Sequence, residues 1–167
     1  YKEKIFINKK TYSQSGEDKF ITSYMNKKKI FNGRYVDLGA FHPIRYNNTY
    51  LLYKKGWSGT NIDLNPAAID MFNIIRTRDD NKCALISNTS NVEKTVYYEH
   101  NFSAVNSLIL TEGLKKVLKK KMKMLSQTFE NLVNLSKLVI GMMPGVIGIS
   151  IFLLCNSSTK KKYASGL

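Results

Sequence analysis

The chain has 167 residues, 43% of them hydrophobic, and its 26 Lys and Arg outnumber 12 Asp and Glu to give a formal charge of +14. This length and composition predict one globular domain with enough chain to bury a core. Cys83 and Cys155 fit no metal-binding or redox spacing, and the lysines are spread over every segment without an RNA-stacking motif or zinc pattern, so we expect neither a metal site nor a nucleic acid partner.

The first predicted element is a helix over residues 13–25, which should pack on the edge of a sheet. Ser15 can cap this helix, and Glu17 and Asp18 lie in its first turn, where the helix dipole favours acidic side chains. Its apolar stripe consists of Phe20, Ile21, Tyr24 and Met25.

Residues 34–43, with the sequence RYVDLGAFHP, predict a buried strand that ends in a tight turn. Ligands of open α/β sheets bind beyond the carboxyl ends of strands, and a turn without large side chains lets them approach the backbone. A dinucleotide needs a cluster of glycines, but this turn contains only Gly39. S-adenosylmethionine needs an acid near its ammonium group, a glycine, and a second acid for its ribose. Asp37, Gly39 and Asp63, which lies 24 positions after Gly39, match these needs, although a turn carboxylate is the alternative for Asp37.

The loop after this turn contains His42, directly before Pro43 in an extended segment. His42 is a weak candidate for a general base, and a structural or solvated histidine is the alternative. Residues 46–55 predict a helix that Asn47, Asn48 and Thr49 cap and that Gly56 ends. Trp57, the only tryptophan, should be buried between helix and sheet.

The order of elements predicts a parallel, doubly wound α/β sheet. A strand over residues 57–63 is followed by a helix that Asn65 caps and Pro66 begins, and then by a strand over residues 82–87 in which Cys83 should be buried. Ser87 should end that strand beside the cofactor, and Asp79 and Asp80 fit ordinary turn carboxylates.

The following residues predict a strand over residues 95–100 and a basic amphipathic helix over residues 111–123. Such a helix either packs its apolar stripe on the core or lies on an anionic membrane or nucleic acid. Asn106 is a candidate hydrogen-bonding residue at the mouth of the site, with a surface loop as the alternative. Residues 126–132 predict a short capped helix.

Six motifs follow one another between residues 12 and 132: YSQSGED, YVDLGAFHP, NNTYLLY, GWSGTNIDLN, RTRDDNKCALIS and SAVNS. In this order and at these distances they resemble the FkbM family of S-adenosylmethionine-dependent methyltransferases. The resemblance implies a Rossmann-like fold and transfer of a methyl group to an oxygen of a saccharide or small metabolite. It implies that the cofactor, S-adenosyl-L-methionine, is bound by Gln14, Asp37, Gly39, Ala40, Asn48, Asp63 and Ser87, and that Asn106 contacts the substrate. For Gln14, a capping role is the alternative.

The resemblance ends where the family has a fourth core strand with an acidic motif. Residues 138–155 instead contain eighteen uncharged residues, followed by a lysine-rich end. A frameshifted end, a membrane anchor, or a divergent strand and helix are the three explanations. We therefore divide the chain into a helical extension (1–33), a methyltransferase domain that is incomplete at its C-terminal side (34–135) and an apolar tail (136–167). We expect a cytoplasmic fragment, membrane-associated if residues 138–155 are an anchor. A non-catalytic basic module that binds a membrane surface or nucleic acid is the alternative function.

Overall fold

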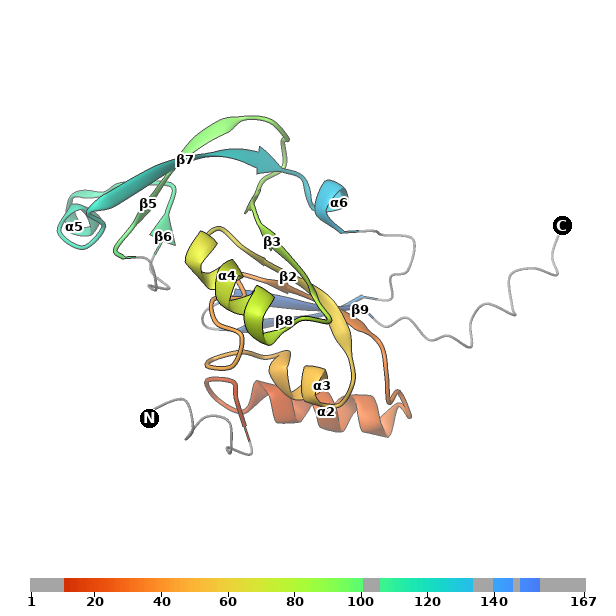
Figure 1. Cartoon of the computed structure of the whole chain (residues 1–167). Helices are drawn as coiled ribbons and strands as arrows, with labels where there is room; N and C mark the ends of the chain where they lie inside the picture. The colour runs from red at the N-terminus through yellow and green to blue at the C-terminus, as the bar shows by residue number, and fades with distance from the viewer. Residues whose placement is uncertain (1–10, 101–105, 134–139, 146–147, 154–167) are drawn as a thin grey trace, which may run out of the picture.

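The computed structural model describes residues 11–100, 106–133, 140–145 and 148–153. The chain forms a mixed α/β structure with two sheets (Figure 1). Sheet A has five strands in the order β3-β2-β1-β9-β8, and sheet B has four in the order β4-β7-β5-β6. The predicted α/β class is confirmed.

One side of sheet A, up to its edge strand β3, is a parallel βαβαβ unit. Its elements are β1 (Arg34–Leu38), α3 (Tyr50–Lys54), β2 (Ser58–Asp63), α4 (Pro66–Ile75) and β3 (Asp80–Cys83). β1 pairs with β2, and β2 pairs with β3, both in parallel register. Since both crossovers step in the same direction, α3 and α4 lie on the same face of the sheet, where they meet Tyr35 of β1. On the opposite face, Val36 and Ile62 pack with residues of α6 (Phe129–Leu132).

The helix α2 (Glu17–Lys27) covers the same face as α3. Ile21 and Met25 of α2 form a buried cluster with Tyr35, Leu52, Tyr53 and Trp57. Burial of Trp57 is therefore confirmed, and its indole nitrogen donates to the Phe31 carbonyl at 3.0 Å. The predicted cap of α2 is wrong: Gly16, in a left-handed conformation, is the N-cap, and the Ser15 amide instead donates to Glu17.

The predicted start of α4 and the predicted end of α3 are confirmed. The Asn65 side chain accepts from the Ala67 amide at 3.0 Å and Pro66 is the first helical residue of α4. Gly56 follows α3 with φ 93°, a conformation that suits glycine at a helix end. However, α3 begins at Tyr50 rather than Tyr46, because the residues before it form the polar loop described below.

The predicted strand 82–87 is divided between the two sheets. β3 ends at Cys83, and β4 (Leu85–Ile86) pairs with β7 in sheet B. The bend follows from competing partners: the Ala84 amide donates to the Asp63 carbonyl of sheet A, whereas the Ser87 amide donates to the Gln127 carbonyl of sheet B. Cys83 is exposed, so its predicted burial is wrong.

Sheet B contains most of the lysine-rich segment. Its other elements are β5 (Glu93–Tyr98), β6 (Asn106–Ser107) and β7 (Lys120–Gln127), with the one-turn helix α5 (Glu112–Lys115) before β7. The strand predicted at 95–100 is thus confirmed, shifted by two residues. The helix predicted over 111–123 is wrong beyond its first turn, because residues from Lys120 pair antiparallel with β5.

Part of the apolar tail completes sheet A. β8 (Ile140–Gly145) and β9 (Gly148–Leu153) form a hairpin, and β9 pairs antiparallel with β1 along its whole length. The edge of β1 that faces away from β2 is therefore covered. Where residues 138–155 are described, they form strands. None of the helices in the described residues combines the length and hydropathy that a membrane span requires.

Candidate functional site

The turn after β1 lies against the end of β2. The amides of Gly39 and Ala40 both donate to the Ile62 carbonyl, at 2.9 and 3.2 Å. Gly39 has φ 68° and is exposed, and Phe41 has φ 56°. Because a left-handed conformation costs a residue with a Cβ atom, this turn suits a glycine, and it presents its backbone at the carboxyl edge of the sheet.

Asp63, the last residue of β2, holds this turn in place. One carboxylate oxygen accepts from the Phe41 amide at 2.9 Å, and the other accepts from the Asn65 amide at 2.8 Å. The side chain is buried, and burial raises the pKa of Asp63 above its ordinary value, although the amides of Asn65, Phe41 and Leu64 oppose the rise. A carboxylate has about four lone-pair sites, so with three amides bound the Asp63 side chain can accept one further hydrogen bond.

Asp37 points to the face of the sheet that α3 covers. Its carboxylate accepts from the Asn47 amide group at 3.2 Å and from the Thr49 hydroxyl at 3.0 Å. Asn47 in turn accepts from the Thr49 amide and donates weakly to the Ala40 carbonyl. Asp37 thus fixes the loop that joins the turn after β1 to α3.

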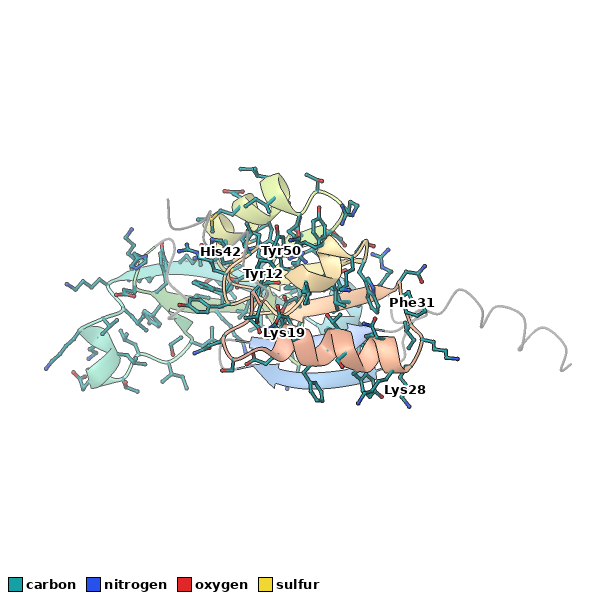
Figure 2. The ribbon with its side chains drawn as sticks, turned by 90° about the horizontal axis from the view of Figure 1, so that it is seen from below. Tyr12, Lys19, Lys28, Phe31, His42 and Tyr50 are labelled. Atoms are coloured by element: carbon teal, nitrogen blue, oxygen red, sulfur yellow. The ribbon has the colours of Figure 1, made fainter. Side chains whose placement is uncertain are left out.

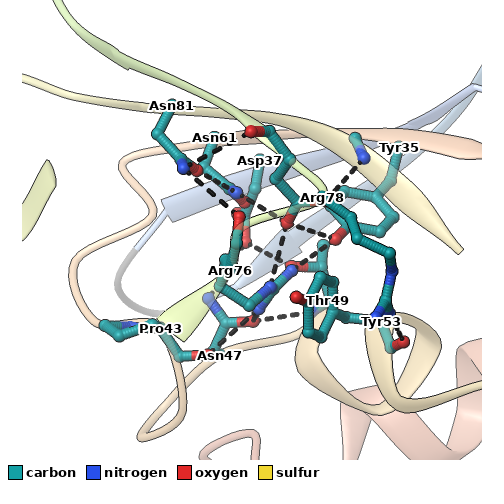
Figure 3. A network of polar contacts seen from close by, with 12 residues as sticks. Tyr35, Asp37, Pro43, Asn47, Thr49, Tyr53, Asn61, Arg76, Arg78 and Asn81 are labelled. Atoms are coloured by element: carbon teal, nitrogen blue, oxygen red, sulfur yellow. Dashed lines mark hydrogen bonds and ion pairs between the residues drawn. The ribbon is translucent and has the colours of Figure 1, made fainter. Parts of the chain in front are cut away.

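Arg76, directly after α4, lies at the centre of this polar network (Figure 3). A guanidinium group has five N–H donors, and all five have an acceptor here. The acceptors are the Asp79 carboxylate (2.9 Å), the Pro43 carbonyl (3.0 Å), the Asn47 side-chain oxygen (3.3 Å), the Tyr35 hydroxyl (2.5 Å) and the Thr49 hydroxyl (3.0 Å). The side chains of Arg76 and Asp79 are fully buried, so the pair ties α4 to β1 and the loop before α3.

Asp79 extends the network to β2. It accepts from the Tyr35 hydroxyl at 2.6 Å, the Gly59 amide at 2.8 Å and the Asn61 side chain at 2.9 Å. Burial raises the pKa of Tyr35, so the phenol remains a donor to Asp79. Asp79 is therefore not the ordinary turn carboxylate that its sequence predicts, and no sequence pattern pointed to Arg76. The spacing of Arg76 and Asp79 is compatible with an ion pair. However, Arg78 and Asp80 carry the same charges and are exposed, so the sequence alone does not identify which arginine and aspartate are buried.

The loop before α2 meets the loop before α3. The Asn47 amide donates to the Tyr12 carbonyl at 3.1 Å, and the rings of Tyr12 and Tyr50 are in edge-to-face contact (Figure 2). The structure therefore brings the segment of Gln14 close to the segment of Asn48. Gln14 is exposed, whereas Asp18 is fully buried and accepts hydrogen bonds from Thr11, Tyr12 and Ser13, which fix the loop.

His42 is buried and interacts with its own loop. Its Nδ1 accepts from the amides of Ile44 and Arg45, both at 3.1 Å. A histidine whose lone pair caps two amides has a structural function in this state, which matches the alternative to a general base.

Ser87 and Asn106, the other predicted site residues, lie in or beside sheet B. Ser87 follows the bend after β3, and its hydroxyl accepts from Lys94 at 3.2 Å. Asn106 pairs with Tyr98 in the β5–β6 ladder. The structure thus brings Gly39, Ala40 and Asp63 together at one edge, links Gln14 and Asn48 through neighbouring loops, and places Ser87 and Asn106 in the other sheet.

A groove of about 280 Å³ lies at the opposite edge of sheet A. Met25, Phe31, Leu52 and Trp57 are among its lining residues. Since β1 and β2 begin next to Phe31 and Trp57, the groove faces the amino ends of the parallel strands and is separate from the Gly39–Asp63 edge.

Comparison with known proteins gives no match: no family model, no curated protein and no solved structure is similar to the chain.

Proposed function

We propose that the chain is an S-adenosyl-L-methionine-binding domain of the FkbM methyltransferase type, with the Rossmann-like fold of that family. One observation carries the proposal: the glycine turn after β1 and the acid that ends β2 meet at the same sheet edge, where the Phe41 amide contacts Asp63. The strand order 3-2-1 supports it, because this is one half of the doubly wound arrangement and ligands bind at the carboxyl ends of such strands.

The residues of this edge fit the ribose end of the cofactor. The Asp63 carboxylate keeps one free lone-pair site beside its three amide hydrogen bonds, and this site would accept from a ribose hydroxyl. Gly39 presents an exposed backbone without a Cβ atom, which allows close approach. When bound, the cofactor supplies an electrophilic methyl group on a sulfonium centre.

Asp37 takes a positioning role in this proposal. Its carboxylate faces Asn47 and Thr49, so it orients the loop of Asn48 rather than meeting the cofactor ammonium directly. Gln14 and Asn48 lie on the neighbouring loops and would contact the methionine end from there.

The proposed reaction is transfer of the methyl group to an oxygen of a saccharide or small metabolite. Methyl transfer is an in-line displacement whose rate depends mainly on alignment of the nucleophile with the methyl group. The residues that bind the cofactor do not need to include a base for this step. We therefore assign the edge to cofactor binding and alignment, and assign no catalytic base.

Calorimetric titration of S-adenosylmethionine into the purified chain tests the proposal. We expect saturable binding that Asp63→Asn weakens about tenfold or more, the effect of losing hydrogen bonds to a charged acceptor. Asp70→Asn is the matched control, because Asp70 is an exposed acid on α4. Circular dichroism establishes that each variant is folded. Absence of binding by folded wild-type protein, or equal weakening by both variants, would refute the assignment.

A further inference from the structure

Sheet B extends away from sheet A and ends at α5 (Figure 1), in a segment that the sequence makes rich in lysine. We define the basic tip as residues 107–121, which include α5 and the start of β7. Leu118 within the tip is buried, as is Val96 of β5, and β5 pairs with β7 from Lys120 onward. The position of the tip is therefore set by the fold, although most of its side chains are exposed.

Positive charge is concentrated on the tip and the strand that leaves it. Between Glu112 and Lys123 the chain has six lysines and one glutamate, and all six lysines are exposed. Glu112 pairs with Lys115, and Glu93 of β5 pairs with Lys123 at 2.7 Å. Among the described residues, Lys116, Lys119 and Lys121 form no ion pair, so the tip retains an excess of positive charge toward solvent.

The same tip exposes aliphatic side chains. Ile109 is 72% exposed, Leu108 43% and Val117 41%. Single exposed apolar side chains are common, but a group of them in one segment is typical of an interaction site. Here Leu108 and Ile109 precede α5, and Val117 directly follows Lys116. Exposed aliphatic side chains and lysines within one segment match the interface of an anionic bilayer, where apolar groups enter the acyl region and lysines remain among the headgroups.

We propose that the basic tip docks the protein on an anionic lipid surface. A nucleic acid fits the tip less well, because binding of single strands relies on exposed aromatic rings. The nearest tyrosines on β5, Tyr97 and Tyr98, are only partly exposed, and exposed aliphatic side chains gain nothing from a phosphate backbone. This docking surface is separate from the Gly39–Asp63 edge and does not depend on the proposed reaction.

Co-sedimentation with vesicles tests the proposal on the full chain. We expect binding to vesicles of 70% phosphatidylcholine and 30% phosphatidylserine, and little binding to phosphatidylcholine alone. The variant Lys116→Gln/Lys119→Gln/Lys121→Gln should bind about a hundredfold more weakly, because each lysine near an anionic surface contributes roughly a fivefold factor. Ile109→Ser should weaken binding about tenfold, since an inserted isoleucine buries apolar area.

A matched triple variant separates a local surface from general charge attraction. Lys19→Gln/Lys27→Gln/Lys55→Gln removes the same charge from exposed positions on and near α2 and α3. This control should bind nearly as well as the wild type, and both triple variants should keep the wild-type circular dichroism spectrum. The proposal is overturned by equal losses in the two triple variants or by an unchanged affinity of Ile109→Ser. Tighter binding to a single-stranded RNA oligonucleotide than to the vesicles would also overturn it, in favour of nucleic acid.

Discussion

Replacing Arg76 by methionine tests whether the buried polar network holds α4 on the sheet. The change keeps much of the side-chain volume and removes the charge and all five N–H donors. Removing one partner of a buried ion pair typically costs 3–5 kcal/mol, because the other charge remains buried. Asp79 keeps three neutral donors, from Tyr35, Gly59 and Asn61. We therefore expect a loss at the lower end of that range, about 3 kcal/mol in the free energy of unfolding.

Urea denaturation followed by the fluorescence of Trp57 measures this loss. The tryptophan is 2% exposed and lies in the core cluster that α2 and α3 form on β1. With a slope of about 1.5–2 kcal/mol per molar urea, a loss of 3 kcal/mol lowers the midpoint by about 1.5–2 M. In addition, a double-mutant cycle of Arg76→Met with Asp79→Asn should give a coupling energy of about 1 kcal/mol or more.

Arg78→Met is the matched control, because it makes the same chemical change two residues along the chain. Arg78 is an exposed residue that donates to the Tyr53 carbonyl at 2.6 Å and contacts the Tyr53 ring. Its loss should cost about 0.5–1.5 kcal/mol, the usual net value of one hydrogen bond. Equal costs for the two arginine variants, or purely additive effects in the cycle, would show that the network does not hold α4 as argued.

Two further predictions concern the space around Gly59 and the protonation of Asp63. A Cβ atom at Gly59 would overlap the ring and carbonyl of Tyr35, so Gly59→Ala should prevent cooperative folding. The control is Gly113→Ala in α5, where a Cβ atom meets no atom within 4 Å, so this change should be neutral or stabilising by up to about 1 kcal/mol. Thermal unfolding of both variants measures the difference. Burial raises the pKa of Asp63, so the folded state releases this proton at higher pH than the unfolded state. The contribution of Asp63 to the free energy of unfolding therefore falls as pH rises from about 3.8 through the folded pKa. Between pH 3.5 and 7, the urea midpoint of the wild type should therefore fall relative to that of Asp63→Asn as pH rises. A difference between the two midpoints that does not change with pH would contradict the raised pKa.

The sequence was sufficient to predict those parts of the fold that short-range chemistry determines. Asn65 and Pro66 fix the start of α4 through one side-chain hydrogen bond and a restricted φ angle, both of which are local properties. The alternation of strand and helix also predicted adjacent parallel strands, and therefore the meeting of Gly39 and Asp63 at one edge. This part of the candidate site follows from topology, since carboxyl ends of parallel strands share an edge.

The remaining features depend on contacts between residues distant in sequence. Leu114, Val117 and Leu118 have helical spacing, but from Lys120 onward the backbone pairs with β5, and this pairing determines the structure of the segment. Similarly, Arg76 and Asp79 become a buried pair only because Tyr35, Asn47 and Thr49 supply their other hydrogen bonds. No local pattern distinguishes Arg76 from the exposed Arg78.

The hairpin beside β1 determines what chemistry the edge can support. In the antiparallel register Ile149 lies next to Leu38, and Gly145 pairs with Gly148, so the joined ends of β8 and β9 lie at the same carboxyl edge as the Gly39 turn. Neither strand contains an ionisable residue. In the proposed reaction, a base for methyl transfer could therefore not come from β8 or β9, and at the end of β2 Asp63 already accepts from the Phe41 and Asn65 amides. For the proposed methyl transfer we accordingly expect an acceptor that reacts with little help from a base, or one that is already an anion.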